Sequence, residues 1–288
     1  MEGCALDVLP TLDAGSVQTC VTSPPYWGLR DYGRAGQIGL EDTPEAYVDR
    51  LVSVFREVRR VLADDGVLWL NLGDTLRGKQ LLGIPWRVAF ALQADGWYLR
   101  SDIIWHKRNG ICESVNDRPT RAHEHVFMMS TRPHYFSDFK SVRQETSDAR
   151  AGRSGRLLGG IGASVGNRVD TPGRDPGSNL QGGARGIEPI RSPDRNLRDV
   201  WPISTSSRWK PDIHQAVMPP DLVEPCIKAG SRIGDTVLDP FSGAGTVGMV
   251  ARRLQRQYVG VELNSDYAAL SRERIEGDQP LFNRAGAT

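Results

Sequence analysis

Long apolar runs and paired cysteines are both missing from this sequence. No stretch reaches the roughly 18 apolar residues of a transmembrane helix, so we expect none. The first ten residues lack the basic stretch followed by an apolar one that marks a secretory signal. The four cysteines (Cys4, Cys20, Cys112 and Cys226) are far apart, which argues against a disulfide framework or a zinc site. These absences predict a cytoplasmic protein with no membrane partner.

Net charge is also nearly absent, because 36 Lys and Arg residues against 35 Asp and Glu leave +1. Taken alone, this balance argues against a polyanionic partner. The charge is uneven, however: residues 141–200 hold ten Arg, no Lys, seven acidic residues and eleven Gly, with almost no apolar periodicity. We therefore expect a flexible, Arg-bearing segment inside a chain whose 288 residues otherwise fit one large domain, or a core domain with an insertion.

On both sides of that segment, strand patterns alternate with helix patterns. Thr43 is a suitable N-cap before Pro44, an apolar stripe beginning at Tyr47 follows at steps of three and four, and a turn at 64–66 is expected to end this helix. The expected strands are 17–22, 67–72, 97–105, 125–130, 236–239 and 258–263. The other expected helices are 84–94, 219–229, 245–257 and 265–276. This alternation predicts an α/β domain built on a parallel sheet.

A glycine motif lies between the strand 236–239 and the helix that follows it. Gly243, Gly245 and Gly248 satisfy G-x-G-x-x-G, and Glu262 ends the next strand 19 residues after the first glycine. Glycines allow close approach of the backbone to a ligand, and a carboxylate at that position can accept hydrogen bonds from ribose hydroxyls. The motif favours an adenosine-containing cofactor over a plain strand–helix turn. Because only 40 residues follow Gly248, strands from earlier in the chain must complete the sheet.

A second motif, Ser23-Pro24-Pro25-Tyr26, follows the first strand. Two prolines cannot continue a central strand, so the chain leaves the sheet there. In a doubly wound sheet, ligands bind outside the carboxyl ends of the strands, so both motifs open onto one crevice. The Ser hydroxyl and the carbonyl of Pro24 can accept hydrogen bonds, while Tyr26 offers a flat face for stacking. This combination suits a planar ligand with an exocyclic amino group, although a rigid strand–helix turn is the simpler alternative.

Together these residues resemble the amino-group DNA methyltransferases in their β-class order. In that order a (D/N/S/T)-P-P-Y motif precedes a target-recognition region, and the S-adenosylmethionine motif comes last. Ser23–Tyr26, the Arg- and Gly-rich segment and Asp239–Gly245 follow one another in this way. Three further segments look like parts of the same family: 102–107, 114–125 and 214–219. The resemblance covers roughly residues 1–138 and 200–288.

The resemblance implies a Rossmann-like, doubly wound, mostly parallel sheet in circularly permuted order. Its catalytic domain would comprise residues 1–138 and 205–288, with an irregular target-recognition insert at 139–204 that reads DNA. The implied catalytic residues are Ser23, Pro24, Pro25 and Tyr26. The implied S-adenosylmethionine-binding residues are Asp239, Pro240, Phe241, Gly243, Gly245, Thr246, Glu262 and Ala216. The candidate DNA contacts are Trp27, Arg30, Arg118, Arg121, Arg185 and Arg191, since Arg binds phosphates and pairs with guanine.

The implied activity is methyl transfer to the exocyclic amino group of a base flipped out of double-stranded DNA. The base is left open between adenine N6 and cytosine N4, because Ser at the first motif position resembles the cytosine enzymes but exceptions occur. A nicotinamide-dependent oxidoreductase and an inactive DNA-binding relative are the alternatives. No metal is expected, because His106, His123 and His125 lack a completing carboxylate or Cys at a familiar spacing. A homodimer remains open.

Overall fold

The computed structural model describes residues 1–31, 33–34, 36–110, 113–145, 194–205 and 218–278. The chain divides into two compact units, one formed by Met1–Val142 with Leu197–Thr288 and the other by Arg143–Asn196. In the second unit, the described residues form an antiparallel pair of short strands, β7 (Gln144–Glu145) and β8 (Asp194–Arg195). The second unit spans fewer residues than the expected insert 139–204. At its C-terminal side this is because residues 200–203 pair with the main sheet.

In the described part of the first unit, seven strands form one sheet in the order β11-β10-β1-β2-β6-β5-β9. Every pairing is parallel except those of β6, so β6 alone among these strands runs in the opposite direction. This confirms the expected α/β fold with a mostly parallel sheet. The strands are β1 (Val17–Thr22), β2 (Leu62–Leu72), β5 (Tyr98–Lys107), β6 (His123–Ser130), β9 (Val200–Ile203), β10 (Thr236–Asp239) and β11 (Gln257–Gly260). A separate hairpin pairs β3 (Leu76–Arg77) with β4 (Gln80–Leu81).

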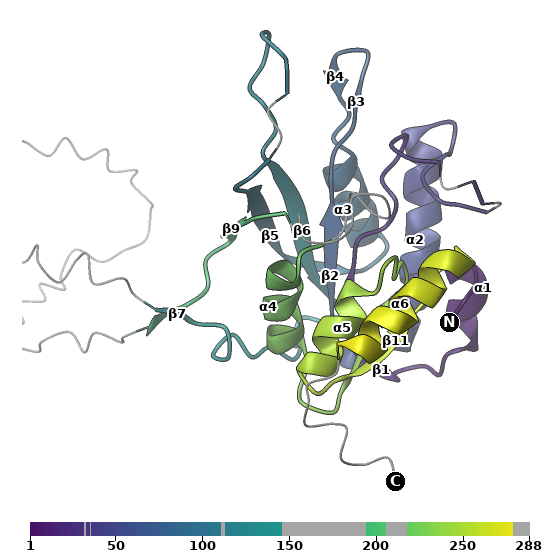
Figure 1. Cartoon of the computed structure of the whole chain (residues 1–288), viewed down its shortest axis with the longest axis vertical. Coiled ribbons are helices and arrows are strands. Elements are labelled where there is room, and N and C mark those ends of the chain that lie inside the picture. Colours follow the sequence, from purple (N-terminus) through teal and green to yellow (C-terminus); the bar gives the residue numbers. More distant parts are fainter. Residues whose placement is uncertain (32, 35, 111–112, 146–193, 206–217, 279–288) are drawn as a thin grey trace, which may run out of the picture. The chain divides into compact units, whose positions relative to one another are not determined.

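Helices cover both faces of this sheet (Figure 1). Alternate residues of β2 show the two layers: Leu68, Leu70 and Leu72 pack into one buried cluster, whereas Val67 and Trp69 pack into the other. The first cluster includes helices α1 (Ala5–Val8), α2 (Pro44–Val61) and α3 (Ile84–Ala94). The second includes α4 (Pro220–Gly230) and α5 (Thr246–Arg253), with α6 (Ser265–Gly277) packed on α5. A short 3₁₀ helix, Leu9–Thr11, follows α1.

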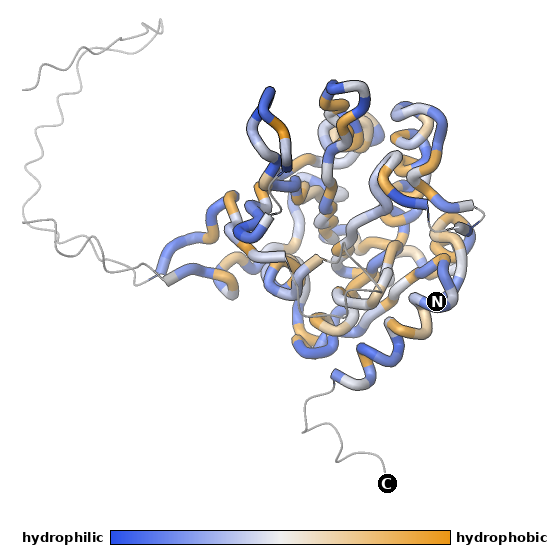
Figure 2. Tube along the Cα trace, turned by 45° about the horizontal axis from the view of Figure 1, so that its top comes forward, coloured by the Kyte–Doolittle hydropathy of each residue, from blue (hydrophilic) through white to orange (hydrophobic). Residues whose placement is uncertain are grey.

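Hydrophobic residues follow this layering, and many loop residues are hydrophilic (Figure 2). The expected start of α2 is confirmed: the Thr43 hydroxyl accepts a hydrogen bond from the Ala46 N–H at 3.2 Å, with Pro44 as the first helical residue. None of the helices in the described ranges combines the length and the apolar character that crossing a membrane requires.

Several element boundaries differ from the sequence expectation, and the largest differences are at the start of β2 and at the end of α5. The turn predicted at 64–66 is wrong, because β2 already begins at Leu62, which pairs with Val17, and the register then shifts before Thr19 pairs with Val67. Helix α5 ends at Arg253 instead of continuing to 257, because Gln255 adopts a left-handed conformation with φ +60°. Both differences arise where the backbone makes local adjustments that apolar spacing does not report.

The sheet order reverses direction at β1, which places the two motifs side by side. From β1 the chain proceeds to β2 on one side, whereas β10 and β11 are added on the other side much later in the sequence. Ser23 directly follows β1 and Asp239 ends β10. The Thr22 hydroxyl donates a 2.6 Å hydrogen bond to the Asp239 carboxylate, which ties the two strand ends together. This is the position at which doubly wound sheets bind ligands.

Candidate active site

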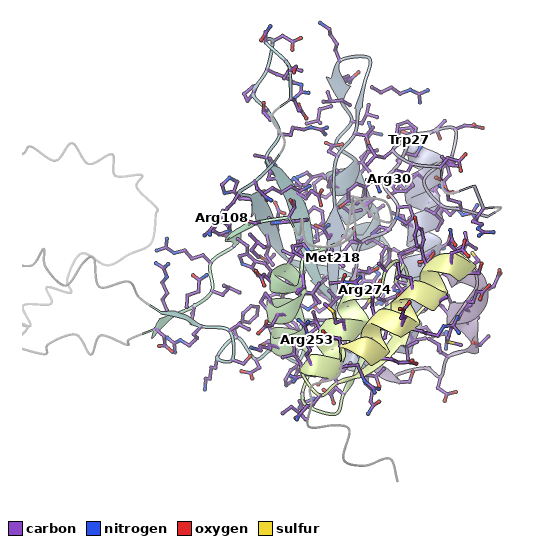
Figure 3. The ribbon with its side chains drawn as sticks, viewed as in Figure 1. Trp27, Arg30, Arg108, Met218, Arg253 and Arg274 are labelled. Atoms are coloured by element: carbon purple, nitrogen blue, oxygen red, sulfur yellow. The ribbon has the colours of Figure 1, made fainter. Side chains whose placement is uncertain are left out.

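A cavity of about 760 Å³ opens at this edge of the sheet. Both sequence motifs contribute to its lining, which includes the predicted residues Ser23, Pro24, Pro25, Tyr26, Arg30, Arg121, Asp239, Pro240, Phe241, Gly243, Thr246 and Glu262. Arg30, from the loop after β1, and Met218, from the segment before α4, also border it (Figure 3). Residues separated by more than 200 positions therefore face one space.

Asp239 is buried on the cofactor-motif side of the cavity. Its Oδ1 accepts hydrogen bonds from the Thr22 hydroxyl at 2.6 Å and from the Phe241 N–H at 3.1 Å. Burial nevertheless dominates and raises the pKa of this carboxyl from 3.8 to about 7, with a smaller contribution from the nearby charge of Glu262. Near neutral pH, Asp239 is thus divided between its protonated and ionised forms.

Glu262 lies just beyond the end of β11 and holds the glycine turn in place. Its Oε2 accepts a 2.7 Å hydrogen bond from the Gly243 N–H, and its Oε1 accepts one of 2.8 Å from the Asn264 N–H. Burial raises the pKa of Glu262, and these backbone donors partly oppose the rise. Each carboxylate oxygen keeps a further lone pair for a hydroxyl group in the cavity.

Glycine is required at the three motif positions for different physical reasons. Gly243 and Gly245 adopt φ values of +50° and +76°, a region that favours glycine. A Cβ on Gly245 would lie 2.3 Å from the Ser271 hydroxyl of α6, and a Cβ on Gly248 would lie 2.5 Å from the Tyr258 ring. Gly245 does not line the cavity, and the turn and the packing against α6 explain why glycine occupies this position.

On the other side of the cavity, the Ser-Pro-Pro-Tyr turn is held by contacts to helix α2 and to Gly73, which follows β2. The Tyr47 hydroxyl of α2 donates a 2.8 Å hydrogen bond to the Pro25 carbonyl. The ring of Tyr26 lies against Gly73, where an added Cβ would come within 2.6 Å of it. Burial and the neighbouring Glu124 raise the pKa of the Tyr26 phenol, so this hydroxyl keeps its proton.

Three residues that sequence reasoning did not assign complete this side. Asn71 near the end of β2, Lys107 at the end of β5 and Glu124 near the start of β6 all line the cavity. The Tyr26 hydroxyl donates to Glu124 Oε2 at 2.7 Å, and Lys107 forms an ion pair with the Glu124 Oε1. Asn71 carried a signal in the sequence, because it is the one polar residue within the apolar run Val67–Leu72.

Comparison with known proteins agrees with this geometry. The DNA methylase family of N6/N4 methyltransferases matches residues 17–273. The type II methyltransferase M.XycI of Xanthomonas campestris pv. cyanopsidis is 43% identical over 317 aligned residues, which cover 99% of this chain and 90% of that protein. M.SmaI of Serratia marcescens is 40% identical, covering 95% of this chain and 89% of that protein. This chain belongs to the N6/N4 DNA methyltransferase family.

Solved structures agree with the fold of this methyltransferase. A DNA modification methylase of Thermus thermophilus, solved with S-adenosyl-L-methionine bound, is 29% identical with a TM-score of 0.62 and covers 98% of this chain and 95% of its own. The PvuII DNA methyltransferase, described as cytosine-N4-specific, shares the fold with a TM-score of 0.68 at 21% identity, covering 98% of this chain and 90% of its own. The enzyme is thus an S-adenosylmethionine-dependent DNA amino-methyltransferase, and the oxidoreductase alternative falls away.

The cofactor half of the cavity fits S-adenosylmethionine on independent grounds. Thr246 is the first residue of α5, and its buried Oγ1 has no hydrogen-bond partner among the described residues. A buried hydroxyl without a hydrogen-bond partner lowers the stability of the folded state unless a ligand supplies the partner. Glu262 offers acceptors for ribose hydroxyls at the opposite strand end. Ala216, the remaining predicted cofactor contact, lies outside the described residues.

The residues predicted to contact DNA lie in different surroundings. Trp27 does not contribute to the cavity: its side chain is 3% exposed, and its indole N–H donates to the Glu41 carbonyl at 2.8 Å. Trp27 thus has a packing role in this structure, and its contact with DNA stays a prediction. Arg118 and Arg121 both pair with Glu113 on the loop between β5 and β6. Arg185 and Arg191 lie outside the described residues.

Two of the three histidines that could have suggested a metal site, His123 and His125, contact other side chains. His125 Nδ1 lies 2.9 Å from Asp102 Oδ1, and its ring stacks on Phe127. His123 packs edge-on against His125, and burial lowers its pKa. Within the described ranges, no group of three or more His, Cys, Asp or Glu side chains is arranged to hold a metal ion.

Proposed function

We propose that this methyltransferase transfers the methyl group to N4 of a cytosine that is flipped out of a specific site in double-stranded DNA. The observation that carries the proposal is the shared cavity, which is lined by the Ser23–Tyr26 turn on one side and by Thr246 and Glu262 on the other. S-adenosylmethionine, when bound, supplies a methyl group on a positively charged sulfur. The chain's own residues must therefore bring an amino nitrogen to that methyl group.

The residues of the turn have separate tasks in this proposal. The flipped base stacks on the Tyr26 ring, while the Ser23 hydroxyl and the Pro24 carbonyl accept hydrogen bonds from the exocyclic amino group. These bonds draw the nitrogen lone pair out of conjugation with the ring and aim it into the cofactor half of the cavity. There the N–CH3 bond would form as the bond between sulfur and the methyl group breaks, and the nitrogen would then lose one proton to water. Flipping costs a few kcal/mol, and most of the rate gain comes from orientation and fixed dipoles instead of from a strong base.

Cytosine N4 is proposed ahead of adenine N6 because of the first motif residue. Ser23 resembles the cytosine enzymes of this family, whereas Asp at that position resembles the adenine enzymes. A neutral hydroxyl also presents a single acceptor oxygen, which suffices for one hydrogen of an amino group. Adenine N6 is the alternative product that the experiment below distinguishes.

Recognition of the DNA sequence is assigned to the insert 139–204, with Arg185 and Arg191 as candidate base or phosphate contacts. Arginine supports this role because it neutralises phosphates and pairs bidentately with guanine. Arg30 and Arg121 line the cavity and are suited to contacting the phosphates beside the flipped nucleotide.

Transfer of a labelled methyl group to DNA of mixed sequence tests the proposal. Digestion of the product to nucleosides should yield N4-methylcytosine, whereas N6-methyladenine would overturn the base assignment. Replacing all four residues Ser23–Tyr26 by Ala should abolish transfer but leave S-adenosylmethionine binding measurable by calorimetry. Full activity in that variant, or no labelled DNA from the unaltered protein on any sequence, would overturn the mechanism.

A further inference from the structure

A half-buried carboxylate, that of Glu124, lies beside the Ser-Pro-Pro-Tyr turn, and the proposed activity does not yet use it. Glu124 Oε1 is held by the ammonium group of Lys107. Glu124 Oε2 accepts two hydrogen bonds, one from the Tyr26 hydroxyl at 2.7 Å and one from the Asn71 amide at 2.9 Å. Asn71 is only 2% exposed, so this group of side chains is held rigidly between β2, β5 and β6.

The hydrogen bonds in this group have a fixed direction. A carboxylate can only accept, so the Tyr26 hydroxyl must direct its single hydrogen at Glu124. The Tyr26 oxygen then accepts from the Asn71 amide at 2.9 Å and from the Ser23 hydroxyl at 3.3 Å. The single hydrogen of Ser23 is thereby directed away from any ligand. Ser23 Oγ accepts a long hydrogen bond of 3.4 Å from the Asn71 amide, and its other lone pair is available to a donor in the cavity.

We propose that Glu124 is a positioning residue that makes Ser23 Oγ a hydrogen-bond acceptor for the exocyclic amino group. The inference rests on the proposed amino-group chemistry and goes beyond it, because Glu124 acts on the substrate only through Tyr26 and Ser23. Lys107 neutralises the carboxylate and fixes which oxygen faces the turn. With a neutral amide in place of the carboxylate, the hydrogen bonds from Ser23 through Tyr26 to residue 124 can reverse their direction. The Ser23 hydrogen then points at the amino group, whose hydrogens Ser23 Oγ should accept.

The variant Glu124→Gln tests this with almost no change in shape. We expect kcat to fall about ten- to a hundredfold, the size expected for one misdirected hydrogen bond in a site sheltered from water. The KM for DNA and the Kd for S-adenosylmethionine should change less than about threefold, because the interaction matters mainly in the transition state. Glu45→Gln is the matched control, because Glu45 pairs with Arg87 on the exposed side of α2 and its side chain is 68% exposed.

The variant Tyr26→Phe provides the second measurement, because it removes the hydroxyl that connects Ser23 with Glu124 without altering charge. It also replaces the first variant as the test if Glu124→Gln fails to fold. It should show the same loss, confined to kcat. In the double variant, the two losses should be far from multiplicative, since either change alone already frees the Ser23 hydrogen.

Three results would overturn the role of Glu124: wild-type kcat in Glu124→Gln, losses that multiply independently, or losses that appear equally in KM and in cofactor binding. If the unaltered protein transfers no methyl group to DNA, the proposed function itself fails. An active unaltered protein with an unaffected Glu124→Gln variant removes only the inference.

Discussion

The variant Asp239→Asn tests the electrostatics of the cofactor motif, because it removes a buried charge while keeping the shape of the side chain. The Asn carbonyl oxygen can still accept from the Thr22 hydroxyl and from the Phe241 N–H, so both hydrogen bonds survive. What disappears is ionisation of a carboxyl whose pKa burial raises to about 7. We therefore expect the variant to be more stable than the unaltered protein at alkaline pH.

The sign and size of this effect follow from proton linkage. Between pH 4 and pH 7 the folded protein holds the Asp239 proton while the unfolded chain has lost it, so the folded state binds more protons and its stability falls as the pH rises. A pKa of about 7 in the folded state and 3.8 in the unfolded chain makes Asp239 destabilising by about 1.5 kcal/mol at pH 5 and about 4 kcal/mol at pH 8. Asn avoids this growing penalty.

Urea unfolding at pH 5 and pH 8 measures the difference, provided that the m-value is unchanged. The advantage of Asp239→Asn should grow by roughly 2–3 kcal/mol between these two pH values. Asp64→Asn is the matched control, because the Asp64 side chain is 81% exposed and its replacement should change stability by less than about 0.5 kcal/mol at either pH. An advantage that is the same at both pH values would refute the reasoning, as would a variant that is less stable at pH 8.

Three further predictions concern stability and cofactor binding. Thr43→Ala removes the N-cap hydrogen bond of α2 and should lower the free energy of unfolding by about 1 kcal/mol in urea titrations. Phe55→Ala empties a fully buried site and should cost about 3–5 kcal/mol in the same assay. Gly15→Ala and Gly245→Ala both place Ala at φ near +70°, but only the second meets a neighbouring atom, so it alone should weaken S-adenosylmethionine binding in calorimetry.

Much of the fold could be predicted because burial imposes a strong pattern on the sequence. Strands β1 and β10 and helix α3 have the predicted bounds, and the apolar residues of each strand and of one helix face are buried in the core. The early start of β2 could not be predicted, because Ala63 and the two acidic residues after it give no strand pattern. The strand begins early because Leu62 pairs with Val17 of β1, a contact between distant segments, and residues 63–66 fall within the register shift that follows this pair.

The cofactor half of the site was easier to predict than the base-binding half. Gly243, Thr246 and Glu262 come from a single strand–turn–helix–strand segment, so their spacing along the chain largely determines their arrangement in space. The burial of Trp27 was not predictable from its position beside Tyr26, because it depends on Glu41 and on Arg77, whose guanidinium lies 5.4 Å from the indole ring centre.

One residue that sequence reasoning left unassigned, Glu124, reaches the site because of one property of the sheet, the reversed direction of β6. Ser23, Asn71 and Lys107 lie at or beyond the carboxyl ends of β1, β2 and β5, which share one direction. In a fully parallel sheet, Glu124 near the start of its strand would lie at the opposite edge. Because β6 is antiparallel to β2 and β5, its first residues reach the carboxyl edge instead, and Glu124 meets Asn71 and Lys107 there. Strand direction, which apolar periodicity does not encode, thus decides which carboxylate contacts the Ser23–Tyr26 turn.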